Sequence, residues 1–203
     1  MEGGLRERKK QKTREEISAA AMALFKERGF DSVTVAEIAH AADVSEKTVF
    51  NYFPAKEDLI VHHGRELVQA LLAAARDATP GTSVVTPFRH MTEALLDAVE
   101  REDVEEIVAV PRLVMGSDTL RRRLMLGWEE EAAALTPVIA ERAGLEPDDF
   151  LATMMARVLS WTHRLIFRAA FTRLLAGEDQ VEVAASLRVE AARAYDKLER
   201  GFG

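Results

Sequence analysis

Two helix-start signals lie eleven residues apart, and this short spacing restricts the fold more than any other feature of the chain. Thr34-Val-Ala-Glu37 is a capping box, in which the threonine and glutamate side chains each bond the backbone N–H of the other residue. Ser45 is a second good N-cap, and Pro54 ends the helix that follows it. The segment therefore has room for two short helices joined by a tight turn at Asp43-Val44.

A longer helix precedes this pair. Apolar residues recur at helical spacing from Ile17 to Phe25, and Gly29 follows where a helix end favours a left-handed residue. With the two short helices, this predicted helix over 8–28 makes a unit of the helix-turn-helix type. We expect Phe50 and Phe53 in its core. Polar side chains suited to phosphates and base edges remain on the second short helix: Ser45, Glu46, Lys47, Thr48, Asn51 and Tyr52.

The rest of the chain is rich in Ala, Leu, Glu and Arg, which favour helices, and no segment alternates like a strand. A turn-rich cluster lies at 79–83. Glycine- and proline-containing breaks separate helices expected over 56–76, 87–101, 104–115, 119–143, 148–176 and 180–200. The sequence predicts an all-α protein of about nine helices. We expect a helix-turn-helix DNA-binding domain over 1–55 and a helical effector-binding and dimerisation domain over 56–203.

Charge is distributed unevenly along the chain. The formal net charge is −7, yet residues 1–14 carry six basic and two acidic side chains, a local charge of +4. We call residues 1–14 the basic segment. A basic segment on an acidic chain is typical of a protein with one nucleic-acid-binding face. A solvated tail with no partner fits the same pattern equally well.

Several classes of protein are disfavoured. Without cysteine there is no disulfide, thiolate zinc site or cysteine nucleophile. There is no phosphate-binding glycine loop and no metal-spaced histidine and carboxylate group. We expect no catalytic residues, no metal and no cofactor, and the chain is not predicted to be an enzyme.

The sequence also shows no targeting signal. The first thirteen residues are polar and basic rather than a signal peptide. The longest apolar stretch, 150–175, is interrupted by cationic side chains, which argues against a membrane span. We expect a cytoplasmic protein.

The run from Thr34 to Ile60, with the preceding Ile17–Phe30 helix, resembles the DNA-binding domain of the TetR family. The resemblance covers nearly a quarter of the chain. One departure is Asp43, because the family usually has glycine in the turn. Aspartate tolerates the left-handed conformation better than most residues, so we expect the turn to form.

The resemblance implies a homodimeric transcriptional regulator that binds a palindromic operator in double-stranded DNA. It places Thr48 and Tyr52 on the recognition helix facing DNA, and Lys56 on a phosphate at the start of the next helix. Thr34 completes the candidate DNA-binding set. The implied function is a repressor that leaves its operator when a small hydrophobic or acyl-CoA-like effector binds.

A dimer face is expected on the last two helices, which join the subunits in the family. The helix over 150–175 is apolar nearly all round, so it must be buried on two sides. One side fits this chain's core, and the other fits a two-fold partner. The residues assigned to that face are Leu151, Met155, Leu159, Ile166, Leu187, Ala191 and Tyr195.

Candidate effector-binding residues combine thioethers and broad rings with arginine. They are Phe88, Met91, Arg112, Met115, Met125, Trp128, Trp161, Arg164, Phe167 and Arg168. The arginines suit an anionic ligand, or they pair with Glu129–Glu131. The stretch from 112 to about 174 resembles, less specifically, the domain class that binds acyl-CoA-like ligands. The alternative is a regulator whose second domain binds a protein partner or only dimerises, with no effector.

Overall fold

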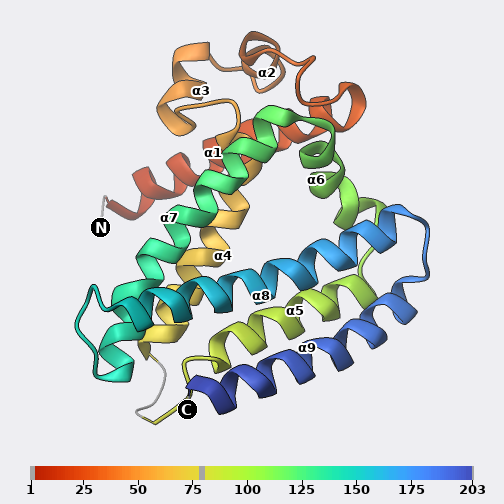
Figure 1. Cartoon of the computed structure of the whole chain (residues 1–203). Helices are drawn as coiled ribbons and strands as arrows, with labels where there is room; N and C mark the ends of the chain where they lie inside the picture. The colour runs from red at the N-terminus through yellow and green to blue at the C-terminus, as the bar shows by residue number, and fades with distance from the viewer. Residues whose placement is uncertain (1–2, 78–80, 203) are drawn as a thin grey trace. The chain divides into compact units, whose positions relative to one another are not determined.

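The computed structural model describes residues 3–77 and 81–202, and this part of the chain forms nine α-helices and no strand (Figure 1). The prediction of an all-α protein with about nine helices is therefore confirmed. The helices are α1 Gly3–Arg28, α2 Val35–Ala41, α3 Glu46–Tyr52, α4 Asp58–Asp77, α5 Thr86–Arg101, α6 Val104–Gly116, α7 Asp118–Ala143, α8 Phe150–Leu175 and α9 Gln180–Phe202.

The helix-start signals are confirmed in detail. Thr34 caps α2 and its hydroxyl accepts the Glu37 N–H at 3.3 Å, while the Glu37 carboxylate accepts the Thr34 N–H at 2.8 Å. Ser45 caps α3 and accepts the N–H of Thr48 at 3.1 Å. Asp43 adopts the left-handed φ of 52° that the turn requires. These local bonds define where the two short helices begin.

Two helices begin at other residues than predicted. Helix α1 begins at Gly3 rather than near residue 8, because the basic segment consists mainly of good helix formers. Side chains one turn apart also pair along it, for example Gln11 with Glu15 at 2.9 Å. Helix α4 begins at Asp58 rather than at 55–56. Residues 79 and 80 of the predicted turn cluster at 79–83 lie outside the described residues.

The chain divides into two compact units. The first contains Met1–Gly64 and Arg112–Arg123, and the second contains Arg65–Pro111 and Leu124–Gly203. Helices α4, α6 and α7 each contribute residues to both. The first unit is thus larger than the 1–55 segment to which we assign DNA binding, and that assignment stays a prediction. We call α1 to α3 the head.

The second unit is built around α5, α8 and α9, which pack together (Figure 1). A short polar chain crosses its apolar core. The Thr92 hydroxyl on α5 bonds Tyr195 on α9 at 2.7 Å and His163 Nδ1 on α8 at 2.8 Å. Burial raises the pKa of Tyr195 to about 12. Burial, with a smaller contribution from Arg164, lowers the pKa of His163 from 6.5 to about 4.

This histidine predicts a loss of stability in mild acid. The unfolded chain binds a proton near pH 6.5, whereas folded His163 stays neutral until about pH 4. The stabilising contribution is complete above pH 6.5 and is lost as the pH falls towards 4. Between pH 7 and 5 we expect the free energy of unfolding to fall by roughly 2 kcal/mol more in the wild type than in His163→Gln. Urea denaturation at both pH values measures the difference; equal losses would contradict the assignment.

Candidate nucleic-acid interface

Helix α3 presents a polar face held in place by an apolar one. Val49, on its inner side, and Phe53, its C-cap, are each 1% exposed and fix the helix against the head. On the outer side Lys47 and Asn51 are exposed and make no hydrogen bond or ion pair with the described part of the chain. A fixed helix with unpaired donors on its outer face is suited to reading base edges in a major groove.

The remaining predicted residues of α3 share this face. Ser45 and Glu46 are exposed, and Thr48 and Tyr52 are partly exposed. The hydroxyls of Ser45 and Thr48 bond each other at 2.8 Å. One hydroxyl must donate to the other, so only one of the two keeps a hydrogen to offer DNA.

The expectation for Phe50 is wrong. Its side chain is 47% exposed, although Phe53 is buried as predicted. On a helix, position 50 falls between Glu46 and Lys47 on the outer face. Phe50 is therefore a candidate DNA contact that sequence reasoning missed, with a ring suited to a thymine methyl group. A helix of only seven residues gives too few positions for its apolar stripe to separate one phenylalanine from the other.

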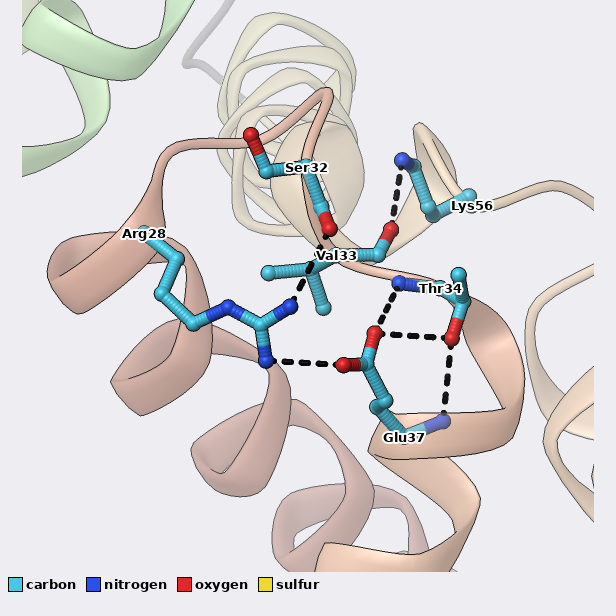
Figure 2. A network of polar contacts seen from close by, with 6 residues as sticks. All are labelled: Arg28, Ser32, Val33, Thr34, Glu37 and Lys56. Atoms are coloured by element: carbon cyan, nitrogen blue, oxygen red, sulfur yellow. Dashed lines mark hydrogen bonds and ion pairs between the residues drawn. The ribbon is translucent and has the colours of Figure 1, made fainter.

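Thr34, in contrast, has no hydrogen left for DNA. Figure 2 shows its backbone N–H and its hydroxyl both directed to the Glu37 carboxylate, each at 2.8 Å. The other Glu37 oxygen pairs with Arg28 at 2.8 Å. The pKa of Glu37 is lowered to about 2. The largest cause is the bond from the Thr34 backbone N–H, followed by the bond from the Thr34 hydroxyl and then by the Arg28 guanidinium. We infer a capping role for Thr34 in place of the predicted DNA contact, because a phosphate needs a donor.

The geometry of Lys56 also differs from that implied by the family resemblance. Its ammonium group donates to the carbonyl oxygens of Phe30 at 2.9 Å and Val33 at 2.8 Å, and the Val33 bond is drawn in Figure 2. It also lies 4.2 Å from the centre of the Phe30 ring. Two of its three hydrogens are thus used inside the protein. Lys56 fastens the turn after α3 to the loop between α1 and α2, and we infer this structural role in place of the predicted phosphate contact.

The structural role of Lys56 predicts a specific response to mutation. Lys56→Met removes two charge-assisted bonds and leaves two carbonyls to be hydrated, so we expect a loss of about 2 kcal/mol in unfolding free energy. The dependence of DNA affinity on salt should stay the same, because no phosphate contact is removed. Urea denaturation and salt titrations measure the two quantities. A lower salt dependence with unchanged stability would restore Lys56 as a phosphate ligand.

The candidate effector-binding residues are divided between the two units. Arg112 and Met115 belong to the first unit and the others to the second. Phe88 is buried, Met91 and Trp128 are partly buried, and Met125, Trp161, Phe167 and Arg168 are exposed. A groove on α9 is lined by Glu190, Arg193, Ala194 and Lys197, and none of these four is a candidate effector-binding residue.

Arg164 pairs with a glutamate, which was the alternative to binding an anionic ligand. It is only 8% exposed, and its guanidinium bonds the Glu131 carboxylate at 2.7 Å. The same group lies 4.9 Å from the ring of Trp128, which in turn packs edge-on against Trp161 at 5.9 Å. The charge of Arg164 is therefore neutralised within the chain. The prediction that Arg164 clamps an anionic ligand is corrected accordingly.

Six of the seven residues assigned to the dimer face are buried in this chain's own core, so the assignment is wrong for them: Met155, Leu159, Ile166, Leu187, Ala191 and Tyr195. Leu151 is exposed. A different set of α8 residues is both apolar and exposed along one side of the helix: Phe150, Met154, Trp161 and Leu165. We call these four residues the α8 face. Helix α9 adds exposed Val181 and Val189.

The described residues include neither a membrane-spanning helix nor a cluster of metal ligands. No helix within 3–77 and 81–202 is long and apolar enough to cross a membrane. Over the same part of the chain, no three histidine or carboxylate side chains gather as metal ligands would.

A capped helix-turn-helix head with an unpaired polar face on its second short helix defines a DNA-binding protein of the regulator class. Residues 17–62 match the family model described as "Bacterial regulatory proteins, tetR family". This match and the relatives below support a TetR-family transcriptional regulator, a class of proteins that are not enzymes.

Relatives match along nearly the whole chain. The transcriptional regulator TcmR of Streptomyces glaucescens is 27% identical over 94% of this chain and 87% of its own length. The structure of Thermus thermophilus FadR in complex with lauroyl-CoA is 29% identical, with a TM-score of 0.51 over 89% of this chain and 94% of that one. Salmonella enterica GusR is 26% identical, with a TM-score of 0.54 over 91% and 95%.

Proposed function

We propose that this regulator is a homodimeric repressor that places α3 of each subunit in the major groove of a palindromic operator. The observation that carries the proposal is the outer face of α3, where Lys47 and Asn51 have no partner among the described residues while Val49 anchors the helix. Lysine suits guanine or phosphate, and asparagine suits adenine. Ser45, Glu46, Thr48, Phe50 and Tyr52 complete the proposed contact surface.

The α8 face supports the homodimer. Four large apolar side chains exposed along one side of a helix make a patch that monomeric soluble proteins rarely leave uncovered. A second copy of the same helix covers such a patch about a two-fold axis. A two-fold protein matches a two-fold operator, with half-sites about one helical turn of DNA apart.

We further propose that a small hydrophobic effector, the acyl-CoA class included, releases the repressor from DNA. The lauroyl-CoA complex of the FadR relative supports this class of effector. Because Arg164 is paired with Glu131, we assign recognition of the effector to its apolar part. An effector acts only by binding one conformation of the protein better than the other, with a coupling of about 1–3 kcal/mol.

Selection of DNA from a random pool tests the repressor proposal. The wild type should enrich an inverted repeat, and the double variant Lys47→Ala/Asn51→Ala should not, although both should melt at similar temperatures. Titrating acyl-CoAs and small hydrophobic compounds should raise the melting temperature and release the selected DNA. No enrichment by the wild type would overturn the DNA-binding proposal; no release by any compound would favour a second domain that only dimerises or binds a protein.

A further inference from the structure

The stretch from residue 15 to residue 64, which follows the basic segment in the first unit, has little positive charge. Residues 15–64 carry four basic and nine acidic side chains, a formal charge of −5. Three of these four cations have partners: Arg28 pairs with Glu37, Lys56 bonds two carbonyls, and Lys26 also has a partner. Among these four, Lys47 alone makes no hydrogen bond or ion pair with the described part of the chain. One unpaired lysine in this stretch supplies little of the phosphate neutralisation on which DNA affinity depends.

The basic segment holds the missing charge. Among its described side chains, Lys9 and Lys10 are exposed and make no hydrogen bond or ion pair. Lys12 makes only a long contact of 3.7 Å with Glu16 on the helix surface, a type of pair that contributes little to stability. Because residues 3–14 are part of α1, these lysines lie at defined positions along a helix.

Arg14 shows where these lysines lie relative to the recognition helix. Its guanidinium lies 5.0 Å from the centre of the Phe53 ring, and Phe53 is the C-cap of α3. Lys10 lies one helical turn before Arg14 on the same side of α1. The N-terminal end of α1 is therefore on the α3 side of the head, as Figure 1 also shows.

We propose that the basic segment binds the phosphate backbone of duplex DNA beside the groove that receives α3, with Lys9 and Lys10 as its main phosphate ligands. This inference rests on the proposed operator binding and adds a contact surface outside the helix-turn-helix. The contact is independent of base sequence, because a lysine ammonium on a phosphate reads charge and not base edges.

The double variant Lys9→Gln/Lys10→Gln tests the proposal in the full-length protein. Glutamine keeps the helix propensity of lysine, so α1 should persist. A dimer loses up to four phosphate contacts, so the slope of log affinity against log salt should become shallower by about 3 to 4. The preference for operator over scrambled DNA should stay within about twofold. Circular dichroism and fluorescence anisotropy at several salt concentrations measure fold and affinity.

A matched control separates local contacts from overall charge. Lys197→Gln/Arg200→Gln removes the same charge from exposed positions on α9, and its slope should equal that of the wild type. An unchanged slope in the Lys9/Lys10 variant, or an equal reduction in the α9 control, would overturn the phosphate-binding role while leaving operator recognition by α3 intact. A wild-type protein without any operator preference would instead overturn the proposed function. The experiment therefore distinguishes failure of the phosphate-binding role from failure of the proposed function.

Discussion

Replacing Leu165 by glutamate should convert the protein into a monomer and weaken operator binding roughly 100-fold or more. Leu165 is 58% exposed on the α8 face, so the change leaves this chain's core intact and places a charge where a partner's apolar surface is expected. Two linked heads bind two half-sites with an avidity that exceeds single-site affinity by about 10² to 10⁴. Light scattering measures the mass, and anisotropy with the selected operator measures the affinity.

The position of the introduced glutamate, rather than its charge alone, should decide whether the dimer forms. Ala94→Glu adds the same charge at an exposed position of α5 and should remain dimeric with wild-type affinity. Val189→Glu, on the exposed side of α9, should resemble Leu165→Glu if both helices contribute to the dimer. A Leu165→Glu protein that stays dimeric at micromolar concentration would exclude the α8 face as the interface.

Removing Glu131 should destabilise the protein by about 3–5 kcal/mol. Arg164 is nearly enclosed, and its partners on α7 are the Glu131 carboxylate at 2.7 Å and the ring of Trp128. Glu131→Ala strands the guanidinium in a poorly hydrated position, where an unpaired charge is costly. Because each kcal/mol moves the melting temperature of a chain of this size by about 2–4 °C, calorimetry should record a drop of the order of 10 °C.

The double variant Glu131→Leu/Arg164→Met isolates the cause. It removes both charges and keeps apolar volume, so most of the loss should be recovered, to within about 1–2 kcal/mol of the wild type. If Glu131→Ala is as stable as the wild type, the pair is not buried in solution. If the double variant is as unstable as the single one, the loss comes from packing rather than from the stranded charge.

Local chemistry explains why the head was predictable from sequence. The capping box at Thr34, the N-cap at Ser45 and the left-handed turn at Asp43 all involve partners within a few residues. Lys56 was not predictable in the same way, because its carbonyl partners lie 26 and 23 residues earlier in the chain. Only the folded head brings them within hydrogen-bond distance.

The exposed side of α8 could not be predicted from the sequence, for a different reason. Its apolar residues surround nearly the whole helix, and both the core set with Met155 and Leu159 and the exposed set with Trp161 and Leu165 repeat at helical spacing. Periodicity identifies such a helix as buried on two sides but does not say which side meets this chain's own core. That choice depends on the packing of α5 and α9 against it.

Hydroxyl-radical footprinting on the selected operator tests the central claim, binding of two half-sites by α3, most directly. The wild type should protect two stretches related by a dyad, with centres about one helical turn apart, or about 10 base pairs. Lys47→Ala/Asn51→Ala should lose this pattern while retaining the wild-type helix content and mass. An identical footprint from that variant would contradict the assignment of α3 as the element that reads DNA.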